Sequence, residues 1–213
     1  MSKKNIIATF VFLVIAFAVA IVYFSPSVLG GKTLNASDSV QFVGMSKWPV
    51  EYRDKTGEEA LWNVGMFGGG PDYTVSTGTA TMFVHKIHKV ASNLIPNSIP
   101  ASQLILSLIC FFVLLRTFGV NTYISIAGAL VYAFNTYNII NIEVGHNTKL
   151  WAISYSCLVL AGMRLSFKGK WIWGLPLFLL GLALELNAGH IQITYYLVFV
   201  CVAYGLSELI YAF

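Results

Sequence analysis

Charged side chains are scarce in this sequence: Asp, Glu, Lys and Arg together make up 10% of its 213 residues. A soluble domain needs far more charge to cover its surface. Hydrophobic residues account for 57% of the chain and the mean hydropathy is +0.72. This composition indicates a protein whose solvent is mostly lipid.

Cysteine is also rare, which excludes a disulfide-stabilised secreted fold. Cys110, Cys157 and Cys201 each fall inside a different apolar run. We therefore interpret them as small buried hydrophobic residues.

Long apolar runs, in contrast, are frequent. About 20 residues are needed to cross a bilayer, and several runs reach that length only with flanking aromatic and small polar residues. The runs are Ile6 to Tyr23, Ser102 to Leu115, Tyr123 to Phe134, Leu150 to Met163, Trp171 to Leu184 and Ile191 to Leu206. The sequence predicts an all-α integral membrane protein with six transmembrane helices, two of them joined by the tight hairpin from Arg116 to Asn121.

Orientation follows from Lys and Arg in the short flanks, because positive charge is retained in the cytoplasm. The cytoplasmic flanks would hold Lys3, Lys4, Arg116, Arg164, Lys168 and Lys170, whereas the opposite short loops offer only Lys149. This pattern predicts a cytoplasmic N-terminus. Eight of the nine carboxylates and all four histidines would then lie on the extracytoplasmic side.

Three parts of the chain are expected. Residues 1–24 form an N-terminal transmembrane anchor, because Ile21 to Phe24 suit a retained span better than a cleavage site. Residues 25–100 form a large extracytoplasmic loop, and residues 101–213 form a five-helix transmembrane bundle.

The large loop is too long to lack structure, and two amphipathic interfacial helices are expected in it. The first would begin at Asn35 as its N-cap, carry Asp38 in its first turn and end at Pro49. The second would run from Thr79 to Leu94. Its apolar face would hold Phe83, Ile87, Val90, Ala91 and Leu94.

Polar residues at helix ends near the membrane are costly unless they are paired or line a water-filled cavity. Asp38 is a candidate general base for an acceptor hydroxyl, although the position also suits a plain helix-start charge. Glu143 and His146 follow the third span, and Glu185, Asn187, His190 and Gln192 surround the next outer turn. These residues either form a functional cluster or bond one helix end to another.

His85 and His88 have a spacing that could place both on one metal ion, but no Cys or carboxylate stands nearby at ligand spacing. A basic interfacial face attracted to phosphate groups is the favoured interpretation of this pair. We therefore expect no metal at this pair.

Taken together, the first span, the large loop with an early Asp and the tight helical hairpins resemble the start of a GT-C-fold glycosyltransferase. More narrowly, the chain resembles the YfhO-type bacterial membrane proteins, a family implicated in glycosylating cell-envelope polymers. The residues that carry this resemblance are Asp38 to Gln41, Tyr52 to Asn63, Met66 to Tyr73, Gly145 to Leu150 and Gly189 to Tyr196.

The resemblance implies that Asp38 is the loop acid that activates the acceptor or organises the site. It also implies a substrate cavity formed by Gln41, Glu143, His146, Lys149, Glu185, His190 and Gln192. The partners would be a polyprenyl-phosphate sugar donor, a cell-envelope polymer or lipid acceptor, and the membrane, with no nucleic acid. No cofactor is expected, and the question of a divalent metal is left open. The protein would lie in the bacterial cytoplasmic membrane. Family members are much longer, so we expect this chain to be the N-terminal portion of such a protein.

Two other classes remain open. A transporter or channel subunit would carry charges deep in its spans or helices broken at the midplane, yet Pro176 is the only proline inside a predicted span. A non-catalytic membrane assembly protein would keep the fold without the chemistry. The sequence favours the glycosyltransferase-like interpretation over both.

Overall fold

The computed structural model describes residues 3–65, 68–72 and 83–212, and these residues are almost entirely α-helical. The first helices are α1 (Lys3–Tyr23), α2 (Ser25–Val28) and α3 (Ser37–Thr56), followed by the short antiparallel strands β1 (Trp62–Asn63) and β2 (Gly70–Pro71). Next come α4 (Phe83–Ser92), α5 (Ile99–Thr117), α6 (Thr122–Ala133) and α7 (Thr136–Val144). The chain continues with α8 (Asn147–Phe167), α9 (Trp171–Asn187) and α10 (Ile191–Ala212).

Among the described residues, four helices are long and apolar enough to cross a membrane, which fits a multi-pass membrane protein. They span Lys4–Tyr23, Ile99–Thr117, Asn147–Phe167 and Ile191–Tyr211. Helices α6 and α9 are equally apolar but shorter. The all-α architecture agrees with the sequence prediction, and the count of six spans stays a prediction.

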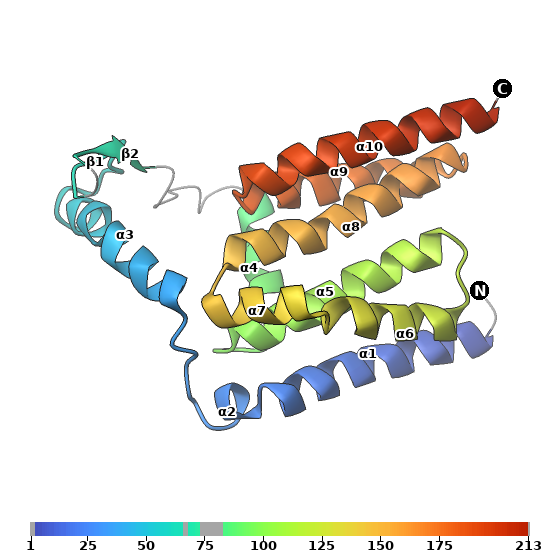
Figure 1. Cartoon of the computed structure of the whole chain (residues 1–213), viewed down its shortest axis with the longest axis horizontal. Helices are drawn as coiled ribbons and strands as arrows, with labels where there is room; N and C mark the ends of the chain where they lie inside the picture. The colour runs from blue at the N-terminus through green and yellow to red at the C-terminus, as the bar shows by residue number, and fades with distance from the viewer. Residues whose placement is uncertain (1–2, 66–67, 73–82, 213) are drawn as a thin grey trace.

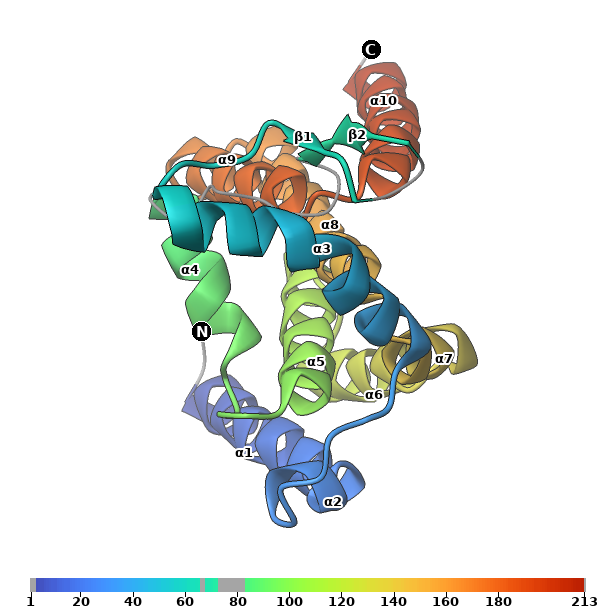
Figure 2. The ribbon, with the colours of Figure 1, turned by 90° about the vertical axis from the view of Figure 1, so that its left-hand side faces the viewer.

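The apolar helices run alongside one another as a bundle with two distinct ends (Figure 1). Helix α1 begins and α10 finishes at one end, which also carries the α5–α6 and α8–α9 turns; we call it the termini end. The opposite end carries α2, the α7–α8 turn and the α9–α10 turn. Because α3 crosses in front of it (Figure 2), we call it the α3 end.

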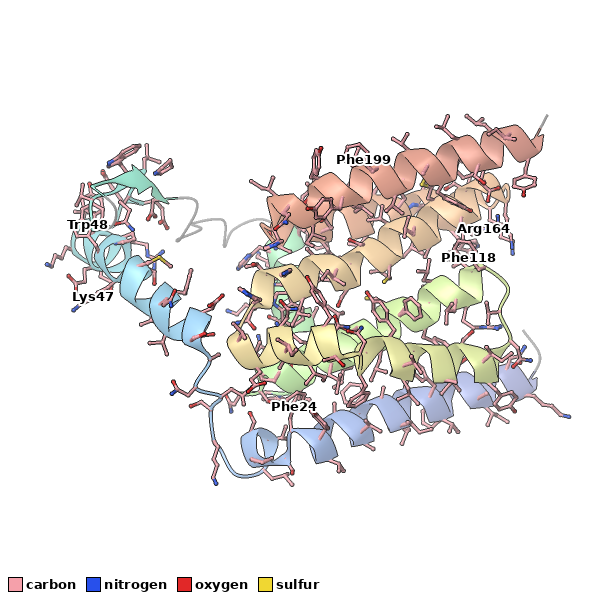
Figure 3. The ribbon with its side chains drawn as sticks, viewed as in Figure 1. Phe24, Lys47, Trp48, Phe118, Arg164 and Phe199 are labelled. Carbon is pink, nitrogen blue, oxygen red and sulfur yellow. The ribbon has the colours of Figure 1, made fainter. Side chains whose placement is uncertain are left out.

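Helix α5 is the centre of the bundle. Its membrane-length segment is 56% buried, whereas that of α10 is only 6% buried. On one side α5 meets α1, where the rings of Phe12 and Phe112 stack 4.3 Å apart. On the other side it meets α8, and Ser107 and Ser154 share a buried hydrogen bond of 2.8 Å. Helix α10 is therefore peripheral, and Phe199 on it points away from the bundle (Figure 3).

Helices α6 and α7 follow each other almost end to end, with a break at Phe134 and Asn135 (Figure 1). The Asn135 side chain accepts a hydrogen bond from the Asn138 backbone N–H. Asn135 and Asn138 both donate to the Tyr132 carbonyl. These amides satisfy backbone groups that a break within a membrane would otherwise leave unpaired.

Helix α3 differs from the sequence prediction at both ends. Its N-cap is Ala36 instead of Asn35, and the helix continues through Pro49 to Thr56. Proline removes the N–H that would bond to the Met45 carbonyl, and the Asn63 side chain of β1 donates to that carbonyl at 2.9 Å instead. The short β-hairpin is thereby attached to α3. The apolar residues of α3 are also spread around the helix, so the predicted amphipathic face is absent.

Helix α4 has its apolar residues on one face, but the face differs from the predicted one. Val84, Ile87 and Ala91 pack against the buried cluster formed around Trp151 and Tyr155. Phe83 and Val90, expected on the same face, are 75% and 69% exposed. The reason is that α4 packs on α5 and α9. Residues 79–82 of the predicted helix lie outside the described residues.

At the termini end, a polar cluster joins three helices. The guanidinium of Arg164 on α8 lies 5.1 Å from the centre of the Phe118 ring and pairs with the Glu208 carboxylate of α10 (Figure 3). Tyr204 donates to the same carboxylate. All three cysteines are free thiols, as the sequence predicts.

Candidate functional site

The α7–α8 turn supplies the base of the candidate site, and a glycine shapes it. Gly145 ends α7 with a φ of 91°, in the left-handed region that favours glycine. A Cβ at this position would lie 2.7 Å from Ser39 Oγ and 2.8 Å from Ala36 Cβ. Gly145 therefore allows the first turn of α3 to pack directly on the turn.

Across this contact, Asp38 and His146 form a hydrogen-bonded pair. Oδ2 of Asp38 lies 2.6 Å from Nδ1 of His146, and their side chains are 36% and 43% exposed. Such a short contact is typical of a charge-assisted hydrogen bond. The sequence predicts that these two residues and His190 face one cavity. The structure brings Asp38 and His146 into direct contact, whereas His190 lies against Thr148.

A cleft of about 490 Å³ opens beside the pair, and we call it the α3 cleft. It lies between the first part of α3, the start of α5 and the α7–α8 turn, at the place where α3 crosses the bundle end (Figure 2). Its lining residues are Asp38, Ser39, Gln41, Phe42, Val43, Met45, Ile99, Gly145, His146, Asn147 and Thr148. Gln41, a predicted substrate-binding residue, is one of them.

Next to the cleft lies a group of basic side chains from two helix N-termini. Thr148 Oγ1 in the first turn of α8 is 3.3 Å from His190 Nδ1, just before α10. Burial lowers the pKa of His190, and the nearby charges of Lys149 and His146 lower it further. The Lys149 ammonium lies 5.0 Å from the centre of the Tyr137 ring. His146, Lys149 and His190 thus lie close to one another beside the cleft.

Gln103, a residue of α5 that is hydrogen-bonded to the start of α8, was not identified from the sequence. Its side chain is 1% exposed, and Nε2 donates to the Asn147 Oδ1 atom at 2.9 Å. The sequence did contain a signal for it: Gln103 is a large amide inside an apolar run, and a polar side chain in such a place is costly unless it is hydrogen-bonded. Gln103 fixes the end of α8 that carries Asn147 and Thr148 into the α3 cleft.

Five predicted site residues do not line the α3 cleft: Lys149 and His190, which lie next to it, and Glu143, Glu185 and Gln192. Glu143 is exposed on α7. Glu185 is fully buried, and both of its carboxylate oxygens lie within hydrogen-bond distance of the Thr194 hydroxyl, at 2.9 and 3.1 Å. Gln192 is exposed and donates to the Tyr196 hydroxyl at 3.2 Å. Glu185 and Gln192 thus bond to the first turns of α10.

The two histidines of α4 face different surroundings. His88 Nδ1 lies 2.9 Å from the Tyr155 hydroxyl, and its ring meets Trp151 edge-on. The centroid of the His85 ring is 6.3 Å away. Within residues 3–65, 68–72 and 83–212, no three His, Cys, Asp or Glu side chains gather in a way that could hold a metal ion.

Comparison with known proteins gave no match to a family model, to a curated protein or to a solved structure.

Proposed function

We propose that this protein is a membrane glycosyltransferase-like enzyme, which transfers a sugar from a polyprenyl-phosphate donor to a cell-envelope acceptor on the extracytoplasmic face. The observation that carries the proposal is the Asp38–His146 pair on an open cleft at the end of an apolar bundle. A sugar carried by a membrane-anchored lipid lies at the membrane surface, which is where the end of the apolar bundle and its cleft would be.

Asp38 supplies the negative charge that draws the proton from the acceptor hydroxyl. Lys149 and His190 lie beside the cleft, where a cation and hydrogen-bond donors can hold the phosphate of the donor. The N-terminus of α8 adds the positive end of its dipole in the same place. Glu143, Glu185 and Gln192 keep only supporting roles, because Glu143 is exposed on α7 and the other two bond to residues of α10.

The proposal includes six crossings and an N-terminus in the cytoplasm of a bacterium. Helix α6 alone measures about 18 Å, too short for a hydrocarbon core of about 30 Å. Together with α7 it forms a broken crossing, in which Asn121 caps the start of α6 and Asn135 caps the start of α7 at the break. Because the start of α1 and the end of α10 lie at one end of the bundle, an even number of crossings is supported (Figure 1).

The test is Asp38→Asn, which keeps the shape of the side chain and removes its charge. In membranes carrying the full chain, transfer from a polyprenyl-phosphate sugar to envelope polymer should fall by about 10²–10⁴-fold, the usual contribution of acid–base catalysis. The matched control is Asp54→Asn, an exposed acid near the other end of α3. It should transfer at the wild-type rate.

Near wild-type transfer by Asp38→Asn, with normal membrane insertion, would remove the acid from the reaction. The non-catalytic assembly protein would then be the better description. His190→Ala should instead raise the donor concentration needed for half-maximal rate more than it lowers the maximal rate. Equal loss in both quantities would argue against a donor-binding role.

A further inference from the structure

We infer that His146 is the group that removes the proton from the acceptor hydroxyl, at its Nε2 atom, and that Asp38 positions the imidazole. The inference deepens the proposed function and rests on it. It assigns separate roles to the two members of the pair.

The geometry decides which nitrogen of His146 carries hydrogen. A neutral imidazole has one N–H donor and one acceptor nitrogen, and a carboxylate can only accept. Because Nδ1 lies 2.6 Å from Asp38 Oδ2, the hydrogen belongs on Nδ1. The lone pair is then left on Nε2, as in metal and catalytic sites where a carboxylate fixes the tautomer of a histidine.

The competing assignment makes Asp38 itself the base. Its Oδ2 already accepts the hydrogen bond from Nδ1 of His146, so that atom is occupied, whereas Nε2 of His146 carries a free lone pair. Asp38 also lies in the first turn of α3, where the positive end of the helix dipole helps to hold the carboxylate in place. Imidazole, in contrast, takes up and releases protons near neutral pH, where general-base catalysis is most effective.

The backbone holds both residues in place without closing the site. The N–H of His146 donates to the Asn141 carbonyl at 2.9 Å, and the carbonyl of His146 accepts from the N–H of Leu150. Gly145 packs on Ser39, the residue that follows Asp38. Both side chains are nonetheless more than a third exposed, so an acceptor hydroxyl can approach.

The reaction balances with these groups alone. The acceptor hydroxyl gives its proton to Nε2 while its oxygen forms a bond to the anomeric carbon of the sugar. The bond from that carbon to the polyprenyl phosphate oxygen breaks, and its electron pair leaves with the phosphate. Asp38 stabilises the imidazolium, which afterwards releases its proton to solvent. Lys149 and His190 are the other ionisable groups beside His146.

The tautomer is measurable without any substrate. The chain has four histidines, so ¹⁵N-histidine labelling in detergent micelles gives few signals, and His146→Gln identifies those of His146. Above pH 7.5 we expect a protonated Nδ1 and an unprotonated Nε2. Asp38→Ala should abolish this preference while the other three histidines keep their shifts. A protonated Nε2 in the wild type would overturn the inference.

Transfer activity supplies the second test. His146→Ala should lose about 10²–10⁴-fold in rate, and added imidazole should restore part of it. The comparison variant His190→Ala should gain nothing from imidazole. If His146→Ala transfers at a near wild-type rate while Asp38→Asn does not, Asp38 is the direct base; the proposed function then stands and this inference fails. Absence of transfer by the wild type would overturn both, whichever tautomer is found.

Discussion

His88 is the residue through which α4 is most closely attached to α8. Its Nδ1 atom shares a hydrogen bond with the Tyr155 hydroxyl, and its ring also contacts Trp151. Burial lowers the pKa of His88 below the ordinary 6.5, and the charge of nearby His85 lowers it further. The folded protein therefore favours the neutral ring more than the unfolded chain does.

This shift predicts a loss of stability in acid. Below about pH 6.5 the unfolded chain binds the His88 proton more readily than the folded protein, so stability is complete above that pH and falls as the pH is lowered further. The measurement is the midpoint of thermal unfolding in detergent between pH 7.5 and 5.0. His88→Gln should flatten this pH dependence.

The control is His85→Gln, which removes only the smaller, Coulombic part of the shift and should flatten the curve less. Equal slopes for the wild type and His88→Gln would show that this histidine does not sense pH in the folded state.

At the scale of elements, helices α8 and α9 make the closest contact in the bundle, through three glycines. A Cβ on Gly162 would collide with the backbone of Phe178, and one on Gly181 would lie 2.8 Å from the Val159 nitrogen. Gly174 lies against the Ser166 backbone in the same way. Small residues of this kind let membrane helices approach until their backbones touch.

Gly162→Val should therefore separate α8 from α9. Overpacking costs about 1–3 kcal/mol, and the expected result is a lower unfolding midpoint in a denaturant titration. Gly205→Ala is the control, because its Cβ would meet side-chain ends and no backbone: Met163 Cε at 3.3 Å and Phe167 Cζ at 4.0 Å. A similar loss for both variants would contradict a specific role for the α8–α9 contact.

Some elements were predictable because their cause lies in neighbouring residues. The hairpin around Gly119 follows from two apolar runs and the turn between them, and α5 and α6 indeed end and begin at Thr117 and Thr122. The course of α3 was not predictable in the same way. Pro49 stays inside the helix because Asn63, distant in sequence, takes over the freed carbonyl of Met45.

The candidate site also combines features that the sequence predicts with features that depend on contacts between distant residues. One-sided charge was enough to predict that Asp38 and His146 face a common cavity. Their direct contact depends on the close packing of Gly145 against α3, which no spacing reveals. The separation of Glu185 from the cleft is a further example, because its burial depends on Thr194 of the adjacent helix.

For the whole molecule, the distribution of charge along the bundle axis makes topology testable. Arg116, Arg164 and Lys168 lie at or near the termini end, whereas α3 and its β-hairpin lie at the other (Figures 1 and 3). Because positive flanks stay in the cytoplasm, we expect the α3 end to be extracytoplasmic.

In a variant with its three cysteines replaced by Ala, a cysteine introduced at Lys55 should react with a membrane-impermeant thiol reagent in intact cells. One introduced at Lys168 should react only after the membrane is opened. The reverse pattern would place the cleft, and the proposed chemistry, in the cytoplasm.

Helix α3 meets the bundle near its first turn, where Ser39 packs against Gly145. From there it extends, with Lys47 and Trp48, away from the bundle end (Figure 3). Its twenty residues measure about 30 Å. If α3 pivots as a rigid helix at the Asp38–His146 pair, a tilt of about 10° displaces its C-terminal end by about 5 Å. Movement of the β1–β2 hairpin would therefore change the geometry of Asp38 and His146, the two residues of the proposed chemistry.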